Sequence, residues 1–377
     1  MNDPVKLTYM IDWFASDVAG GTEVQLINMI NGLNEKGFEI TLICLRSGNW
    51  EKLDTDMVSC TTKMMEINKF KRPVTYLNYL KLISHFRKNR PDVVHTFFPT
   101  SNVIGVLAAR LAGVKAIVSS RRDYGEWMNT KYLIATKFAN RFVDKVISNS
   151  HPVKYLTVGK EKLSESKVDV IFNGIDVSRF DSLKVDLDLK ESLGIPRNDK
   201  VVAILANFRP MKYHWTFVRA AKIILDKRPD VSFLLIGEGP TMADTQKLAD
   251  ELGVANKMFF AGSRGDVIDL LPIIDVGVNC SEAEGLSNAI MEYMCAGVPC
   301  VVSDGGGNTD LIHNGVNGYT FDLDDHDALA HLTLEVLGDD ELCHRFIEES
   351  KKFILENMTL DIVVSKYEET YKNLIQK

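Results

Sequence analysis

The sequence is poor in cysteine and has no long apolar run. Its six cysteines are scattered over 377 residues, and no two of them form a C-x-x-C pair, which argues against a zinc site and favours a reducing compartment. No apolar run approaches the roughly 18–20 residues that span a bilayer. The first residues, M-N-D-P-V-K, lack the basic and apolar regions of a signal peptide. We therefore expect a cytoplasmic protein.

Two recognition motifs are also missing. A glycine pair, Gly20-Gly21, follows the first predicted strand, but it is not part of a G-x-G-x-x-G motif. The end of the second predicted strand holds Leu45 and Arg46, where a dinucleotide-binding protein has an acid for the ribose. No nucleic-acid recognition motif accompanies the basic residues. These absences disfavour a dehydrogenase and a nucleic-acid-binding protein.

The net charge of −7 conceals an asymmetry between the two halves of the chain. Residues 1–180 carry 25 Lys+Arg against 18 Asp+Glu, a net charge of +7, and the remainder carries 19 against 33, a net charge of −14. Residues 69–90 contain seven basic residues and no acid, interleaved with tyrosine, leucine, isoleucine and phenylalanine. This pattern indicates a basic amphipathic helix. Such a helix either lies on an anionic membrane surface or packs on its sheet as an ordinary surface helix.

Strands and helices alternate along the chain in two series. The first begins with a strand over residues 5–11, a glycine turn, a helix over 22–35 and a strand over 39–45, which is a βαβ unit. A polar stretch at 181–199 reads as a linker, and a second series starts with the strand at 201–205. A final helix over 359–377 is long enough to return to the first domain.

These alternating elements predict the α/β class, with two doubly wound Rossmann-like domains over residues 1–180 and 200–358. Each domain has a parallel sheet covered on both faces. Such sheets bind ligands at the carboxyl ends of their strands. We therefore expect the two domains to face each other across a ligand-binding cleft.

Residues 279–307 carry the strongest local pattern. Two acids, Glu284 and Glu292, bracket a G-L-S turn and the start of a helix that Ser287 can cap and Gly297 can end. The N–H groups at a helix N-terminus suit a phosphate, and carboxylates accept hydrogen bonds from sugar hydroxyls. A diphosphate between two sugars would satisfy every part of the pattern. The alternative is an ordinary capped surface helix with solvated acids.

This stretch, from E-A-E-G-L-S-N-A-I-M-E to C-A-G-V-P, resembles the signature of the retaining glycosyltransferases of family 4. The resemblance implies the GT-B fold. It also implies that Glu284 contacts the donor sugar and that Glu292 contacts the nucleotide ribose. Gly285, Leu286 and Ser287 would then complete the donor-binding turn.

Four further loops resemble donor-side segments of the same family. In A-N-F-R-P-M-K-Y-H-W, Arg209 and Lys212 follow a strand and suit a diphosphate, although Asn207 stands where many members carry the arginine. Gly237 and Gly239 in I-G-E-G-P, Arg264 in A-G-S-R-G-D-V, and Gly20 and Gly21 in G-G-T-E resemble loops around the nucleotide and its phosphates. Each glycine segment could equally be a plain turn.

The acceptor side departs from the family pattern. Many members carry a histidine near the transferred sugar, where this chain has Arg121, Arg122 and Asp123 at the end of a predicted strand. The two arginines could bind an acidic group of the acceptor or could form a salt-bridged loop. His95 ends another predicted strand. It could face the cleft, but a core histidine with satisfied hydrogen bonds is the favoured alternative.

The resemblance covers residues 20–318 and implies a retaining glycosyltransferase that moves a sugar from a nucleotide diphosphate sugar, most commonly UDP-linked, to an acceptor hydroxyl. The acceptor would be a sugar or a lipid-linked sugar in cell-surface polysaccharide or glycolipid synthesis. GT-B enzymes use no metal, and the three D-x-D triplets lie in polar stretches, so neither a metal nor another cofactor is expected. The alternatives are a GT-B epimerase or phosphorylase, and a non-catalytic subunit that binds a sugar nucleotide.

Overall fold

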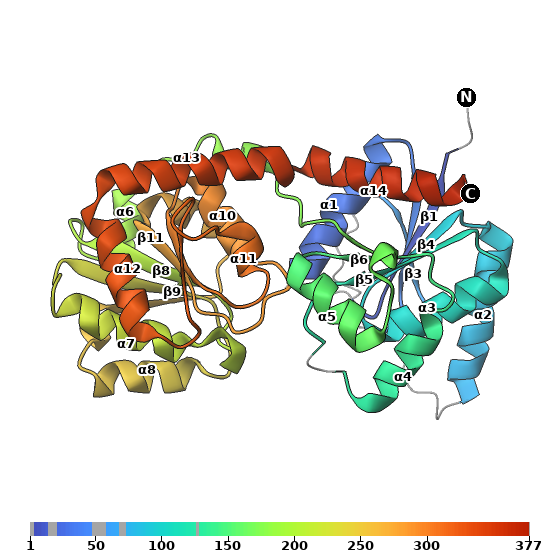
Figure 1. The fold of residues 1–377 in the computed structure, drawn as a ribbon, viewed down its shortest axis with the longest axis horizontal. Coiled ribbons are helices and arrows are strands. Elements are labelled where there is room, and N and C mark those ends of the chain that lie inside the picture. The colour runs from blue at the N-terminus through green and yellow to red at the C-terminus, as the bar shows by residue number, and fades with distance from the viewer. Residues whose placement is uncertain (1–3, 14–20, 47–57, 68–72, 126–127, 377) are drawn as a thin grey trace. The chain divides into compact units, whose positions relative to one another are not determined.

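The computed structural model describes residues 4–13, 21–46, 58–67, 73–125 and 128–376. The chain forms two compact units. The first unit comprises residues 1–174 together with 360–377, and the second comprises residues 175–359. Each unit contains one parallel sheet with helices on both of its faces (Figure 1). This confirms the predicted fold class of two doubly wound α/β domains.

The first sheet has seven parallel strands in the order β3-β2-β1-β4-β5-β6-β7. Most of its strands are buried along nearly their whole length because both faces of the sheet are covered. Alternate residues of β1 enter different cores: Leu7 and Tyr9 join one buried cluster and Met10 joins the other. The strands are β1 (Lys6–Ile11), β2 (Glu39–Cys44), β3 (Thr61–Met64), β4 (Val93–Thr96), β5 (Ala116–Arg121), β6 (Lys145–Ser148) and β7 (Val168–Val170).

The helices of the first unit include one from the far end of the chain. Helix α14 packs beside α1 (Figure 1) and buries Val363, Val364, Tyr367 and Tyr371 in the same core as Tyr9. The hydroxyls of Tyr9 and Tyr371 lie 3.1 Å apart and share a hydrogen bond. The helices are α1 (Gly21–Glu35), α2 (Pro73–Asn89), α3 (Pro99–Ala112), α4 (Thr130–Ala139), α5 (His151–Glu161) and α14 (Leu360–Ile375).

The second sheet has six parallel strands in the order β10-β9-β8-β11-β12-β13. Its strands are β8 (Lys200–Leu205), β9 (Val231–Ile236), β10 (Met258–Gly262), β11 (Val276–Asn279), β12 (Cys300–Ser303) and β13 (Tyr319–Phe321). Its helices are α6 (Leu187–Ser192), α7 (His214–Leu225), α8 (Met242–Glu251), α9 (Val267–Leu270), α10 (Asn288–Ala296), α11 (Asn308–Leu311), α12 (His326–Gly338) and α13 (Asp340–Asn357).

The stretch 181–199 differs from the predicted linker. It belongs to the second unit and contains helix α6, which Asp186 caps by accepting hydrogen bonds from the backbone of residues 188 and 189. Lys190 and Ile195 are buried, and the Lys190 ammonium donates to the carbonyl of Arg197 at 3.0 Å. The segment therefore packs into the second unit despite its polar composition. The buried lysine is tolerated because its ammonium donates hydrogen bonds to backbone carbonyls.

Among the helices described, none is both long enough and apolar enough to cross a membrane.

Candidate functional site

Five loops meet at the carboxyl edge of the second sheet, after strands β8, β9, β10, β11 and β12. Strands of one parallel sheet end on the same side, so the loops become neighbours. Backbone hydrogen bonds join them in pairs: Phe208 N to Glu238 O at 2.9 Å, Gly237 N to Gly262 O at 2.8 Å, Glu282 N to Met211 O at 2.9 Å, and Gly307 N to Glu284 O at 2.8 Å. These bonds hold the loops as one frame for the side chains they carry.

Glu284 and Lys212 form an ion pair within this frame. Lys212 ends the short 3₁₀ helix η5 (Pro210–Lys212) after β8, and Glu284 lies in the loop after β11. Their side chains are 17% and 16% exposed, so the pair is shielded but reachable. Ser281 also donates a hydrogen bond from its hydroxyl to the Glu284 carboxylate, at 3.0 Å. The arrangement therefore places an ammonium group, which can bind an anionic oxygen, beside a carboxylate, which can accept hydrogen bonds from sugar hydroxyls.

Glycines let the loop backbones approach each other closely. Gly237 and Gly239 have φ values of +139° and +153°, and a Cβ on either would overlap with a carbonyl of the 206–208 loop. A Cβ on Gly307 would overlap with the carbonyl of Gly285, in the turn next to Glu284. The structure therefore explains why glycine occupies positions 237 and 239: a larger residue would overlap with the neighbouring loop. Their predicted donor-binding role stays a prediction.

Helix α10 begins and ends where the sequence predicts. Ser287 is its N-cap and accepts a hydrogen bond from Ile290 N at 3.4 Å, while Gly297 ends the helix with φ +76°. The amide of Asn279 donates to the Ser287 hydroxyl at 3.3 Å, which ties the cap to strand β11. Gly285, Leu286 and Ser287 therefore lie directly between Glu284 and the N-terminus of the helix, where backbone N–H groups suit an anion.

Glu292 lies within α10 and is partly buried. Burial raises the pKa of its carboxyl to about 7, and the charge of Arg179 acts in the opposite direction. Arg179 belongs to the 3₁₀ helix η4 (Val177–Phe180), which packs against α10. No hydrogen bond joins Glu292 to Glu284 in the described part of the chain, so their convergence on one ligand stays a prediction.

The two other predicted donor-side cations differ in availability. Arg209 follows β8 and its side chain is exposed, next to the η5 turn that carries Lys212. Arg264 instead donates from Nε to the Asp266 carboxylate at 2.8 Å and forms an ion pair with it. Its guanidinium is therefore engaged with its own loop, and only its backbone remains for the predicted contact with the base. Among the residues described, no cluster of three or more His, Cys, Asp or Glu could hold a metal ion.

His95 is a core residue of the first unit, which is the alternative the sequence favours. Its Nδ1 lies 2.6 Å from the Tyr371 hydroxyl and its Nε2 lies 2.8 Å from the Ser120 hydroxyl. Burial holds the pKa of the imidazole well below its ordinary value, and the charge of Arg122 lowers it further. With no exposed surface and both nitrogens engaged, His95 does not present a group to an acceptor.

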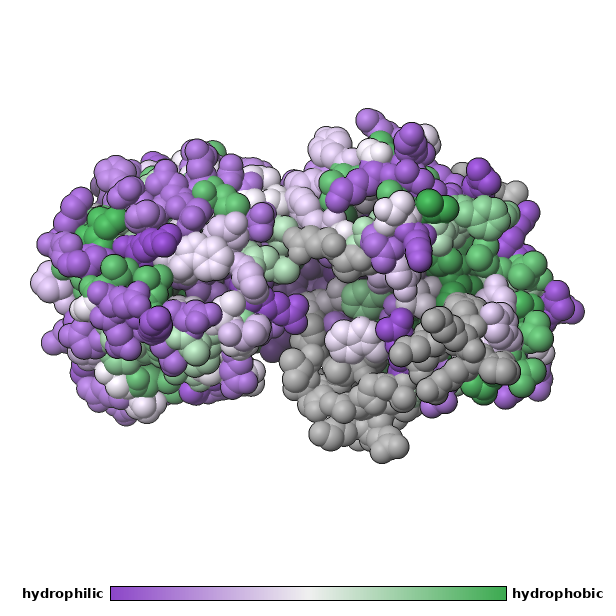
Figure 2. Space-filling view, turned by 90° about the horizontal axis from the view of Figure 1, so that it is seen from below, coloured by the Kyte–Doolittle hydropathy of each residue, from purple (hydrophilic) through white to green (hydrophobic). Residues whose placement is uncertain are grey.

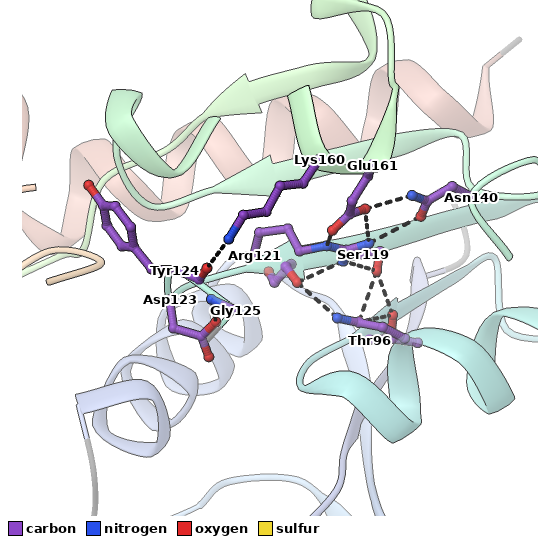
Figure 3. A network of polar contacts seen from close by, with 11 residues as sticks. Thr96, Ser119, Arg121, Asp123, Tyr124, Gly125, Asn140, Lys160 and Glu161 are labelled. Atoms are coloured by element: carbon purple, nitrogen blue, oxygen red, sulfur yellow. Dashed lines mark hydrogen bonds and ion pairs between the residues drawn. The ribbon is translucent and has the colours of Figure 1, made fainter. Parts of the chain in front are cut away.

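Arg121 is salt-bridged inside the first unit (Figure 3). Its Nε and Nη2 donate to the two Glu161 carboxylate oxygens at 2.7 and 2.9 Å, and Nη2 also donates to Asn140 at 3.1 Å. Although burial alone would raise the pKa of Glu161, Arg121 and Asn140 hold that pKa below its ordinary value. The bidentate pair leaves Arg121 no free face for an acceptor, so the structure favours the salt-bridged alternative.

Arg122 is partly buried and contacts different residues from Arg121. Its guanidinium donates to the Asn173 side chain, and burial lowers the pKa of the group while Tyr367 and Glu23 partly restore it. Gly21 is the first residue of α1, whereas Gly20 lies outside the described residues. The acceptor-binding role of Arg122 and the donor-binding role of the glycine pair stay predictions.

Three supporting residues were not predicted from the sequence. Ser281 and Gly307 hold the Glu284 loop, and Arg179 acts on Glu292. A triple glycine at 305–307 directly after a strand was a readable signal, because three successive glycines indicate close backbone approach. No local signal marks Arg179, because it lies more than a hundred positions before Glu292 in the chain.

Comparisons with known proteins agree with this geometry. The family model described as glycosyl transferases group 1 matches residues 186–353, and the model of glycosyltransferase family 4 matches residues 19–179. The chain is 27% identical to the UDP-Gal:alpha-D-GlcNAc-diphosphoundecaprenol alpha-1,3-galactosyltransferase of Escherichia coli, over 93% of this chain and 96% of that protein. It is 24% identical to the lipopolysaccharide core biosynthesis glycosyltransferase LpsE of Rhizobium meliloti, over 92% and 94%.

Solved structures share the fold over the whole chain. The structure of Anabaena HepE in complex with UDP superposes with a TM-score of 0.87 at 20% identity, covering 98% of this chain and 100% of that one. The complex of HepE with UDP-glucose gives a TM-score of 0.84 at 21% identity, over 98% and 99%.

Proposed function

Because this chain belongs to glycosyltransferase family 4 and is a glycosyltransferase of the GT-B fold, we propose that it transfers a hexosyl group from a UDP-sugar to a hydroxyl of a lipid-linked sugar, with retention of configuration. The observation that carries the proposal is the shielded Lys212–Glu284 pair, with Ser281 on the carboxylate, at the carboxyl edge of the second sheet. The UDP-galactose and diphospholipid named for the Escherichia coli relative support this choice of donor and acceptor.

The proposed mechanism is electrostatic. The bond from the sugar C1 to the β-phosphate oxygen breaks, and its electron pair stays on UDP while the acceptor hydroxyl oxygen bonds to C1 on the same face. The acceptor proton passes to the departing phosphate. Lys212, Arg209 and the N-terminus of α10 stabilise the diphosphate charge that develops, without reorganising during the step. Glu284 orients the sugar hydroxyls and Glu292 orients the ribose.

A second part of the proposal is that the enzyme works at the cytoplasmic face of an anionic membrane. Helices α2, α3 and α4 pack in sequence on the first unit, and none of the three contains an aspartate or glutamate. Basic side chains accompany large exposed apolar ones on these helices. The basic residues are Lys81, Arg87, Lys88, Arg110, Lys131 and Lys137. The exposed apolar residues are Val74, Tyr76, Leu77, Leu80, Leu111, Ile134 and Phe138.

The composition of this acid-free surface of α2, α3 and α4 favours binding to anionic lipid. Figure 2 shows hydrophobic side chains gathered on the surface of the first unit, beside hydrophilic ones. Apolar side chains can enter the headgroup region while lysine and arginine pair with lipid phosphates. Of the basic stretch 69–90, residues 69–72 lie outside the described part of the chain. A diphospholipid acceptor would reach the enzyme at such a surface.

The transfer reaction is tested with purified protein, a panel of UDP-sugars and a soluble alkyl diphosphate sugar as acceptor. We expect product with the α-linkage of the donor retained. We expect Lys212→Ala to lower kcat by at least 100-fold, equivalent to about 3 kcal/mol, because it removes a fixed charge from the leaving group. The matched control is Lys222→Ala, which breaks an exposed ion pair with Asp226 on α7 and should change kcat less than twofold.

Two results would contradict this proposal. Formation of an epimerised UDP-sugar without any acceptor would indicate an epimerase, and formation of a sugar phosphate from added inorganic phosphate would indicate a phosphorylase. A normal kcat in Lys212→Ala, with the same melting temperature as the parent protein, would remove Lys212 from the reaction.

A further inference from the structure

Phe98 adopts a backbone conformation that is almost reserved for glycine. It follows β4 and directly precedes α3, with φ +68° and ψ 162°. Strain of this kind persists only where the surroundings fix it, and it concentrates at sites that hold a ligand. Phe98 packs against the core of the first unit, but only as a partly buried residue. The preceding Phe97 already fills the core, buried against His95 with ring centroids 4.5 Å apart, whereas Phe98 remains partly exposed.

The strained backbone turns the Phe98 ring toward Trp13. The two rings are nearly parallel, with an interplanar angle of 10° and centroids 6.4 Å apart. Trp13 comes just after β1, the strand that pairs with β4, and is 44% exposed. Two large aromatic rings therefore lie together at the carboxyl edge of the first sheet, with apolar faces that water reaches. The C–H faces of a pyranose stack on such rings.

A cation contacts the first turn of α3, the helix that Phe98 directly precedes. Arg46 follows β2, which lies on the other side of β1, and its Nη2 donates to the Thr100 hydroxyl at 2.9 Å. Its Nε is buried and has no hydrogen-bond partner among the described residues. The carboxylate of Asp12 accepts from Thr100 N at 3.0 Å and from Ser101 N and Oγ at 2.6 Å, and no hydrogen bond joins it to Arg46 among the described residues.

We propose that Trp13 and Phe98 form the platform on which the sugar ring of the acceptor stacks, and that Arg46 binds an anionic group carried by that sugar. The proposal rests on the proposed transfer reaction and names its acceptor class, a pyranose with an adjacent phosphate or carboxylate. The Arg46 side chain is only partly buried, and its guanidinium has no carboxylate partner among the described residues. An anionic ligand at this edge would supply the opposite charge, because guanidinium groups bind carboxylate and phosphate.

The platform is tested by kinetics on the full chain with an alkyl diphosphate sugar as acceptor. Trp13→Ala should raise the KM for the acceptor at least tenfold, while the KM for the UDP-sugar and its slow hydrolysis without acceptor change less than twofold. Trp13→Phe should restore most of the acceptor affinity. The control is Tyr155→Ala, which removes a 64% exposed ring on α5 of the same unit and should change nothing. An unchanged acceptor KM in Trp13→Ala overturns the platform.

A second variant keeps the test decisive if Trp13→Ala folds poorly. Phe98→Leu retains apolar volume against the core but removes the ring, and it should give the same selective rise in acceptor KM. Equal rises in the acceptor and donor KM values would indicate a general distortion and would overturn the proposal.

Arg46 is tested with three acceptors that share a sugar and differ in charge: an alkyl glycoside, its diphosphate analogue and an alkyl uronide. Arg46→Met should weaken the charged acceptors and leave the neutral glycoside unchanged. A loss confined to the diphosphate identifies phosphate as the ligand group, and a loss confined to the uronide identifies a carboxylate. Equal effects on all three acceptors overturn the role of Arg46.

The platform and the transfer reaction can fail separately. Quenching of tryptophan fluorescence by the alkyl diphosphate sugar reports binding without turnover, with Trp13→Phe as the reference. Quenching that disappears in the reference supports the platform even if no sugar is transferred. Normal transfer with unchanged acceptor KM in both platform variants overturns the platform and leaves the transfer reaction standing.

Discussion

At the residue scale, Glu292 is a titratable group whose environment couples protonation to folding. Its carboxyl has a pKa of about 7 because burial penalises the charged form. The folded state therefore binds the proton more tightly than the unfolded chain, whose glutamate titrates near pH 4.5. The contribution of this bound proton to the free energy of unfolding is fully present below pH 4.5 and is lost as the pH rises through 7.

We expect this coupling to appear as a difference between the parent protein and Glu292→Gln. Between pH 4.5 and 8 the free energy of unfolding of the parent should fall by about 2 kcal/mol relative to the variant. This is less than the full shift implies, because Glu292 is only partly buried. Urea denaturation at pH 4.5, 6 and 8 measures the difference. A constant difference across this range would mean that Glu292 stays charged in the folded protein.

Some residues of the candidate site could be predicted from the local sequence, and others could not. Glu284, Ser287 and Gly297 lie in one short stretch whose spacing itself determines a turn, a cap and a helix end, and the structure confirms the cap and the end. The sequence favours a core position for His95, but the partners of Arg121 and His95 could not be read this way. Their partners Glu161 and Tyr371 lie 40 and 276 positions away in the chain, so only the fold reveals that both are engaged.

At the scale of elements, α14 is bound to the first sheet by a buried polar contact as well as by packing. The Tyr371 hydroxyl lies 3.1 Å from the Tyr9 hydroxyl and 2.6 Å from His95 Nδ1. Tyr371→Phe removes one oxygen and leaves two buried polar groups without a partner. We expect it to lower the free energy of unfolding by about 1–3 kcal/mol.

Urea denaturation followed by circular dichroism checks this expectation for Tyr371. Tyr155→Phe is the control, because Tyr155 is 64% exposed and its hydroxyl is reached by water. If both variants lose the same stability, the buried hydrogen bonds contribute nothing that water does not replace.

Elements with a buried apolar face were the predictable ones. The strands of both sheet interiors are buried, mostly apolar segments bounded by turns, and the sequence predicts most of them. Strand β3, helix α5 and helix α6 are not predicted. Strand β3 is a polar edge strand, T-T-K-M, with a half-exposed face, and α6 is a single short helix whose buried lysine looks like a surface residue. Neither carries the periodic apolar signal on which such predictions depend.

At the scale of the whole molecule, the charge asymmetry predicts selective binding to lipid. We expect the protein to float with vesicles rich in anionic lipid and not with neutral vesicles, and to be released as salt screens the contact. Leu77→Glu with Leu80→Glu should abolish flotation, because both side chains are about 60% exposed on the acid-free surface of α2, α3 and α4.

Val316→Glu, at an exposed position of the second unit, is the control for this experiment and should float normally. Flotation with neutral vesicles, or normal flotation of the α2 variant, would exclude this surface as the lipid contact. Solution turnover with a soluble acceptor should be the same in all three proteins, since none of the changed residues belongs to the donor site.

The division of the first unit between residues 1–174 and 360–377 also sets an order of assembly during synthesis. When residue 174 leaves the ribosome, seven strands have been made, yet the core around Tyr9 and His95 still lacks Val363, Tyr367 and Tyr371. The second unit is contiguous and can close its own core first. The domain whose synthesis begins first is therefore the one completed last, and until then a nascent chain exposes an unsealed apolar surface that chaperones would have to cover.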